Sequence, residues 1–200
     1  MSERVLVIGN GSSTKEFELG NKIDEFDIVV RFNRGYFEGV NKFEKYVGSK
    51  TNILIVHDGF AKPERLTDDV LESVDKVLIV IPKFKFNGDL VKDYGWGDKV
   101  QVIPVDYEVR LNGLHDFKNR WPTTGLVGLY FICDNYDDVT IYGFDGSDEK
   151  YKYYHYFAKE DGRTTEFMNR PNRVDHDKDI ERKCINEIKE VYNLKDLRDE

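Results

Sequence analysis

The stretch RVLVIGNGSS at residues 4–13, followed by IVVRFN at residues 28–33, decides the fold expected of this chain. Each segment contains a short apolar run, and such runs predict buried parallel strands. A glycine-rich turn, Gly9 to Ser13, follows the first run, and Asn33 closes the second. Open α/β sheets bind ligands outside the carboxyl ends of their strands. The stretch therefore predicts the opening of a nucleotide site.

Further apolar runs alternate with amphipathic segments along the 200 residues. The predicted strands are 51–56, 76–81, 100–105 and 139–145, and the predicted helices are 63–73, 122–133 and 177–192. Segment 34–50 is expected to be loop or short helix. This alternation predicts an α/β fold with a mostly parallel sheet flanked by helices. Because no linker-like segment divides the chain, residues 1–200 are expected to form a single domain.

The composition and charge argue against several classes of function. The chain has 30 basic and 38 acidic residues, a formal charge of −8, which argues against a nucleic-acid partner. No stretch approaches the ~20 apolar residues of a transmembrane segment, and no signal-peptide core follows Met1. Cys133 and Cys184 lie in apolar helical patterns, which predicts buried reduced thiols. These observations predict a cytoplasmic location.

The glycine turn only partly matches a dinucleotide fingerprint. Gly9 and Gly11 fit its first two glycines, but Thr14 stands at the third. The second strand ends in Asn33 rather than in the carboxylate that holds a ribose diol, which disfavours a dehydrogenase. Asn10 and Asn33 are suited to bind a ribose or a pyrimidine, although asparagine is also common in turns without a ligand.

Thr123, Thr124 and Gly125 follow Pro122 at the start of an apolar helical pattern. A helix N-terminus with exposed N–H groups and two hydroxyls is a good anion site. The alternative is plain capping of the helix by threonine.

Two histidines lie in sequence contexts that suit proton transfer or phosphate binding. His155 lies within the aromatic stretch 153–157, and His176 precedes the last predicted helix. A histidine can accept a proton from a hydroxyl or hold a phosphate, and the alternative is an ordinary surface or core histidine. The spacing predicts that His176 shares an inward helix face with Ile180.

No compact set of metal ligands is evident. Asp175, Asp177 and Asp179 alternate at a helix start, a place where acidic side chains favour the helix dipole. No metal and no cofactor are therefore predicted.

Taken in order, these segments resemble four motifs of the eukaryote-type sialyltransferases, glycosyltransferase family 29. The long motif is similar to residues 4–56, including IDEFDIVVRFN at 23–33 and VGSKT at 47–51. The short motif is similar to residues 122–144, the third motif to His155-Tyr156, and the very short motif HxxxxE to His176 with Glu181.

The resemblance implies a Rossmann-like variant of the GT-A glycosyltransferase fold. It also implies transfer of sialic acid from CMP-sialic acid to the hydroxyl of a glycan or glycolipid acceptor, with inversion and without metal. His176 would be the general base, His155 would support the departing phosphate, and Glu181 would orient local structure. The implied donor-binding residues are Asn10, Gly11, Ser12, Asn33, Thr123, Thr124, Gly125, Tyr154 and Tyr156.

The chain also departs from the family. The resemblance implies a disulfide between the long and short motifs, but only Cys133 is present and Val5 stands at the other place. No membrane anchor or stem is evident, which predicts a compact relative. Three alternatives stay open: a transferase of another CMP-sugar such as CMP-Kdo, an inactive CMP-binding module, or an unrelated α/β nucleotide enzyme. No pattern identifies the acceptor.

Overall fold

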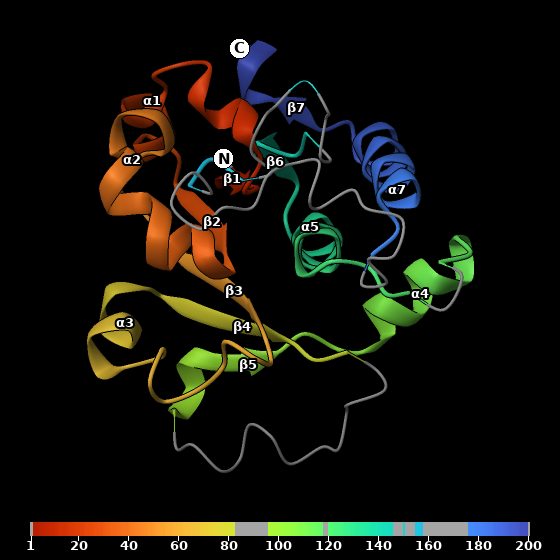
Figure 1. The fold of residues 1–200 in the computed structure, drawn as a ribbon, viewed down its shortest axis with the longest axis horizontal. Coiled ribbons are helices and arrows are strands. Elements are labelled where there is room, and N and C mark those ends of the chain that lie inside the picture. The colour runs from red at the N-terminus through yellow and green to blue at the C-terminus, as the bar shows by residue number, and fades with distance from the viewer. Residues whose placement is uncertain are drawn as a thin grey trace.

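The computed structural model describes residues 2–82, 96–117, 120–145, 150, 155–157 and 176–199. Within these residues seven strands form one sheet in the order β5-β4-β3-β2-β1-β6-β7 (Figure 1). All paired strands run parallel, which confirms the predicted parallel sheet. The strands are β1 Arg4–Ile8, β2 Ile28–Phe32, β3 Ile53–His57, β4 Lys76–Val80, β5 Val100–Val102, β6 Asp138–Tyr142 and β7 Lys195–Asp196.

Helices cover both faces of the sheet, as expected. In Figure 1, α1, α2 and α3 lie on one side and α4, α5 and α7 on the other. The helices are α1 Gly20–Asp24, α2 Val40–Val47, α3 Asp68–Ser73, α4 Asp106–Leu114, α5 Thr124–Asn135 and α7 Lys178–Val191. None of these described helices is long and apolar enough to cross a bilayer.

The core has two layers because successive strand residues point to opposite faces. In β1, Val5 and Val7 pack into the cluster shared with α5 and α7, whereas Leu6 and Ile8 pack on the side of α1. Gly128 lets α5 lie close to the sheet, since a Cβ there would come within 2.7 Å of the Phe32 ring.

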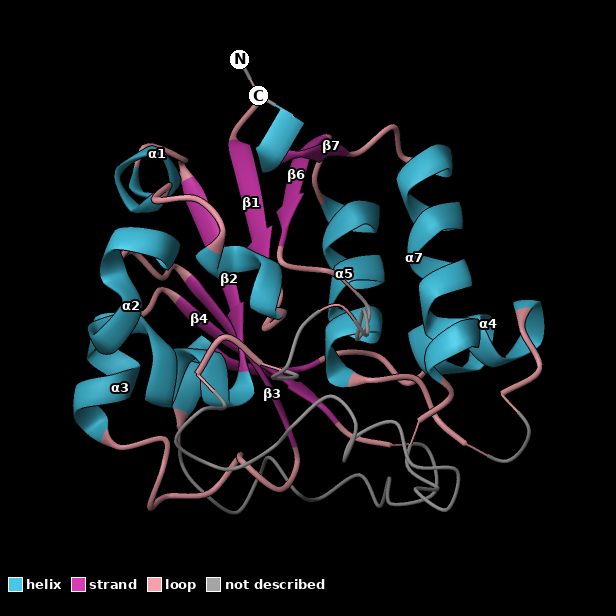
Figure 2. Cartoon of the chain, turned by 45° about the horizontal axis from the view of Figure 1, so that its top comes forward, coloured by secondary structure: helices cyan, strands magenta, loops and turns pink. Residues whose placement is uncertain are grey.

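The strand order reverses between β1 and β6. Strands β2 to β5 extend the sheet on one side of β1, and β6 and β7 extend it on the other. Such a switch point places the ligand outside the carboxyl ends of the two strands. Figure 2 shows the strand arrowheads at a common edge of the sheet, with the N-terminal ends of α5 and α7 at the same edge. The fold therefore directs attention to the residues that follow β1 and β6.

Several predicted element boundaries were wrong. The helix predicted from residue 63 begins at Asp68, because Thr67 is extended (φ −71°, ψ 165°) and interrupts the preceding turns. The strand predicted to 105 ends at Val102, where Pro104 lacks an N–H to continue the ladder. The strand predicted to 145 ends at Tyr142, because Gly143 turns the chain with φ +72°.

The segment predicted as loop or short helix contains a π-helical turn, Gly35–Gly39, followed by α2. The turn after α2, residues 48–51, is held by two charged side chains of the long motif. Arg31, which is 2% exposed, donates to the carbonyls of Val47 (2.6 Å) and Lys50 (3.0 Å). The Asp24 carboxylate accepts the N–H groups of Ser49 and Lys50. Both side chains therefore hold this turn in place.

The two cysteines behave as predicted. Cys133 in α5 and Cys184 in α7 are buried free thiols, and burial raises the pKa of each to about 12. Val5 is fully buried within β1, so the bridge implied by the resemblance has no second cysteine there.

Candidate active site

The exits of β1 and β6 are joined by backbone hydrogen bonds. The N–H of Gly9 donates to the carbonyl of Tyr142 (2.7 Å), and the N–H of Gly11 donates to that of Gly143 (2.9 Å). A Cβ on Gly9 would lie 2.4 Å from the Gly143 oxygen. The glycines are therefore needed for the close approach of two strand ends, and their N–H groups are already used within the protein.

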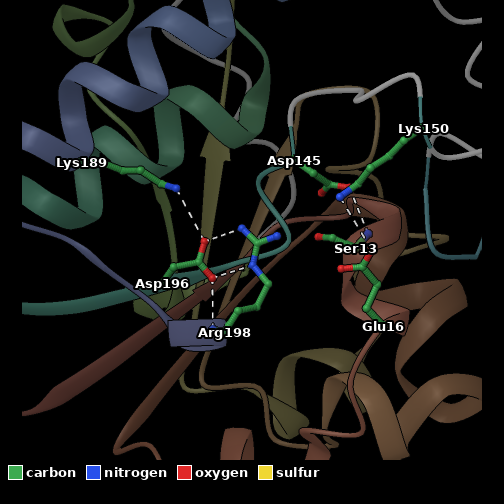
Figure 3. A network of polar contacts seen from close by, with 7 residues as sticks. All are labelled: Ser13, Glu16, Asp145, Lys150, Lys189, Asp196 and Arg198. Carbon is green, nitrogen blue, oxygen red and sulfur yellow. Dashed lines mark hydrogen bonds and ion pairs between the residues drawn. The ribbon is translucent and has the colours of Figure 1, made fainter. Parts of the chain in front are cut away.

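Asp145 occupies the place where a dinucleotide-binding fold holds its pyrophosphate. Its carboxylate accepts the N–H of Ser13 at 3.0 Å, at the start of the 3-10 helix Ser12–Lys15 (Figure 3). A Cβ on Gly11 would overlap Asp145 Oδ1. Burial raises the pKa of Asp145. A carboxylate at this position disfavours a dinucleotide. Sequence reasoning missed Asp145 as a site residue, because it stands as the last residue of the strand predicted over 139–145.

Figure 3 also draws the contacts that pin the C-terminal segment. Arg198 donates to both carboxylate oxygens of Asp196, at 2.8 and 2.6 Å, and Lys189 of α7 lies 3.6 Å from the same carboxylate. The Lys189 contact links β7 to α7, and β7 itself pairs in parallel with β6.

Asn10 and Asn33 lie at the ends of neighbouring strands, as predicted. The amide nitrogen of Asn10 donates to the Phe32 carbonyl at 3.3 Å, which ties it to the residue before Asn33. The amide oxygen of Asn33 accepts the N–H of His57 at 2.9 Å. Asn33 has φ +42°, a left-handed backbone that asparagine tolerates better than most residues. In the described part of the chain the amide nitrogen of Asn33 makes no hydrogen bond, so it is suited to contact a ligand.

The structure also brings His155 to the β1 exit. His155 forms an antiparallel bridge with Gly11, and the N–H of Tyr156 donates to the carbonyl of Asn10 at 3.1 Å. The His155 ring stacks on Phe157 with centroids 4.9 Å apart. His155 and the glycine turn are thus neighbours, although residues 11 and 155 are far apart in sequence.

Tyr156 is placed differently from its predicted role at the donor. Its side chain is 1% exposed, and its hydroxyl donates to the carbonyl of Gly35 at 2.9 Å. Burial raises the pKa of this hydroxyl. The Tyr156 hydroxyl therefore holds the first residue of the π-helical turn Gly35–Gly39. Tyr154 lies outside the described residues.

Thr123 caps α5, the alternative that the sequence left open. Its hydroxyl oxygen accepts the N–H of Leu126 at 3.2 Å. Thr124 and Gly125 form the first turn of the helix. The Phe144 ring lies between this turn and the β1 exit, since a Cβ on Gly9 or Gly125 would come within 3.2 or 3.9 Å of it. The α5 N-terminus therefore adjoins the switch point.

His176 is positioned by the segment that precedes α5. Its Nδ1 lies 2.8 Å from the carbonyl oxygen of Trp121. A carbonyl only accepts, so Nδ1 carries the proton, and in the neutral ring Nε2 has the lone pair that a general base requires. Arg120 donates to the carbonyl of His176 at 3.3 Å and pairs with Asp177 at 3.6 Å. Sequence reasoning missed Arg120 and Trp121.

The predicted helical placement of His176 was wrong. Asp177 caps α7 by accepting the N–H of Ile180 at 3.1 Å, so the helix begins at Lys178. His176 lies before the cap and does not share the face of Ile180.

Glu181 joins α7 to α5, in agreement with the orienting role implied for it. It is 8% exposed, and its carboxylate accepts the N–H of Thr123. Burial raises the pKa of Glu181 to about 7, against the opposing effect of the Thr123 hydrogen bond. Among the described residues, no three His, Cys, Asp or Glu side chains gather as metal ligands.

The raised pKa of Glu181 predicts a pH-dependent stability. Since the folded state disfavours the ionised carboxylate, the free energy of unfolding should fall as pH rises from the unfolded value of 4.5 through about 7, by roughly 3 kcal/mol in total. Glu181→Gln keeps an acceptor for Thr123 and should abolish this fall. Urea unfolding at pH 5 and pH 8 measures it. Glu190→Gln, on the exposed side of the same helix, is the control and should match the wild-type profile. A fall that persists in Glu181→Gln contradicts the assignment.

Comparison with known proteins identifies the family. Residues 2–85 and 105–191 match the model of glycosyltransferase family 29 (sialyltransferase), which covers more than half of the chain. The chain belongs to this family, and the resemblance found in the sequence is confirmed.

The relatives it matches are mostly longer. CMP-N-acetylneuraminate-beta-galactosamide-alpha-2,3-sialyltransferase 1 of Pan troglodytes is 28% identical over 174 residues, which cover 77% of this chain and 47% of the relative. The corresponding sialyltransferase 2 of Mus musculus is 27% identical over 165 residues, with 77% and 46% covered. The chain thus spans about half the length of the curated relatives it matches.

Solved structures support the fold. The structure of a mammalian sialyltransferase superposes with a TM-score of 0.69 at 23% identity. The superposition covers 98% of this chain and 69% of the sialyltransferase chain. A second mammalian sialyltransferase structure, in complex with Gal-beta-1-3GalNAc-ortho-nitrophenol, gives a TM-score of 0.64 at 22% identity. The parallel sheet flanked by helices is therefore shared with a sialyltransferase, while its description as a GT-A variant stays a prediction.

Proposed function

We propose that this protein transfers sialic acid from CMP-sialic acid to a hydroxyl of a glycan or glycolipid, with inversion and without metal. The observation that carries the proposal is the placement of His176 against Trp121, beside the switch point, in a member of the sialyltransferase family. Its cytoplasmic location and single-domain organisation stay predictions.

The donor is proposed to lie across the ends of β1 and β2. Asn10, Gly11, Ser12 and Asn33 would contact the CMP moiety. His155, fixed to Gly11 by a β-bridge, would support the phosphate together with the first turn of α5. The carboxylate of Asp145 and the used N–H groups of the glycine turn weigh against the dehydrogenase alternative.

In the proposed reaction the acceptor oxygen attacks the anomeric carbon from the face opposite the phosphate, which inverts the centre. The bond from the anomeric carbon to the phosphate oxygen breaks, and its electron pair leaves with CMP. Nε2 of His176 takes the proton of the acceptor hydroxyl. A general base of this kind contributes about 10²–10⁴-fold to the rate.

Nucleotide binding tests the donor site directly. CMP at 100 times its dissociation constant should stabilise the protein by ~2.7 kcal/mol, which raises the melting temperature by roughly 5–10 °C for a domain of this size. CDP, UDP and NAD at the same concentration are the controls and should give smaller shifts. Protection by NAD but not by CMP would overturn the proposal.

A donor panel then separates the remaining alternatives. CMP release from CMP-sialic acid, measured in the presence of EDTA, supports the proposed donor and metal independence, and NMR of the product reports its anomeric configuration. Release from CMP-Kdo alone would replace sialic acid as the donor. Tight CMP binding without turnover on any acceptor would favour a binding module.

A further inference from the structure

A cluster of aromatic and cationic side chains lies at the carboxyl end of β3, beside the proposed donor residues but not among them. It consists of His57, Phe60 and Arg65, with Phe37 from the turn after β2. Phe37 and Phe60 stack with centroids 6.0 Å apart, and His57 meets Phe60 edge-on at 4.7 Å. The hydrogen bond from the His57 N–H to Asn33 fixes the cluster to the end of β2. The cluster is therefore part of the same sheet edge as the donor residues.

Arg65 is an exposed cation held by rings instead of by a carboxylate. Its guanidinium carbon lies 4.2 Å from the centroid of Phe60 and 6.0 Å from that of Phe37. In the described part of the chain it forms no ion pair, whereas three other exposed arginines face carboxylates: Arg4, Arg110 and Arg182. Stacking on aromatic rings pre-positions the guanidinium fork, which is the group best suited to bind carboxylate or phosphate.

His57 lines the cluster through its ring. Its Nδ1 accepts the N–H of Gly59 at 2.9 Å and lies 3.6 Å from Oδ1 of the neighbouring Asp58. The apolar C–H faces of a saccharide pack on aromatic rings such as those of this cluster.

We propose that His57, Phe60 and Arg65 form an acceptor subsite for an acidic saccharide, one that carries a carboxylate or a phosphate. This inference rests on the proposed function and adds the class of acceptor. An acceptor held there by its anionic group lies along the same edge as the donor residues, where open α/β sheets bind their ligands.

The test compares disaccharide acceptors that differ in whether they carry an anionic group. The probes are a neutral galactosyl-glucose disaccharide, the galactosyl-glucuronate analogue and the same disaccharide with a phosphate on its glucose. Arg65→Gln should raise KM for the acidic probes about tenfold, the equivalent of ~1.4 kcal/mol. It should leave kcat for all probes and KM for the neutral probe at their wild-type values. The acidic probe whose KM rises more shows whether the subsite binds a carboxylate or a phosphate. Arg110→Gln is the matched control, because Arg110 also lies over a ring, that of Tyr107 at 5.3 Å, but pairs with Asp134.

The outcomes separate this inference from the proposed function. If Arg65→Gln transfers to acidic and neutral probes as the wild type does, the subsite is wrong and the transferase proposal stands. If no probe is turned over, saturation-transfer NMR of the acidic probes on the wild-type protein still decides. A signal that is salt-sensitive and weaker in Arg65→Gln supports the subsite, and an equal signal in both proteins overturns it.

Discussion

His176→Ala is expected to lower the rate of sugar transfer by about 10²–10⁴-fold, because the substitution removes the proposed general base. CMP binding should change little, since the contacts proposed for the nucleotide lie at the ends of β1 and β2. Turnover of CMP-sialic acid and the CMP-induced thermal shift, measured on the same preparation, separate chemistry from binding.

The control variant changes a different histidine, His115, which contacts α7. Nε2 of His115 lies 3.2 Å from Glu187 of α7, so His115→Asn removes a contact with α7 other than the contact between His176 and Trp121. This variant should keep its turnover. Near-wild-type transfer by a folded His176→Ala protein would show that another group removes the proton.

Arg31→Met is expected to destabilise the fold by about 3–5 kcal/mol, because it leaves buried acceptors without their charged donor. The carbonyls of Val47 and Lys50 and the hydroxyl of Thr51 would all lose a hydrogen bond. Burial lowers the pKa of Arg31 to about 10, so the cation is present over the whole neutral range. Urea unfolding at pH 7 measures the loss.

The matched control for this prediction is Arg4→Met. Arg4 also donates to a backbone carbonyl, that of Glu25, but its side chain is half exposed, and exposed pairs contribute little. A loss below 1 kcal/mol is expected for Arg4→Met. Equal losses in the two variants would mean that burial of Arg31 contributes nothing of its own.

The sequence predicts the sheet well because short continuous apolar runs indicate strands that are buried on both faces. Val5 and Val7 alternate with Leu6 and Ile8, and both sets are buried, as in a strand covered on two faces. Helix α4 was missed, because its apolar and polar residues show no clear helical periodicity. Strand β7 was missed because two residues carry no detectable pattern.

The candidate site was predicted in its residue types but not in its contacts. Asn10 and Asn33 lie at the ends of the neighbouring strands β1 and β2, as expected for strand ends in a parallel sheet, and His155 joins them through its bridge to Gly11. The use of the Gly9 and Gly11 N–H groups, the burial of Tyr156 and the contact of Trp121 with His176 depend on tertiary packing. Spacing along a sequence does not report which partner a polar group finds.

The position of β1 has a consequence for synthesis of the chain. This strand is made first, yet it pairs with β6 along one edge, and β6 comes late in the sequence. At the usual pace of translation that edge waits on the order of ten seconds for its partner. An unpaired strand edge is a template for aggregation. The edge of β1 is therefore exposed to intermolecular pairing during synthesis, and the candidate active site assembles only after β6 and the segment around His176 have been made.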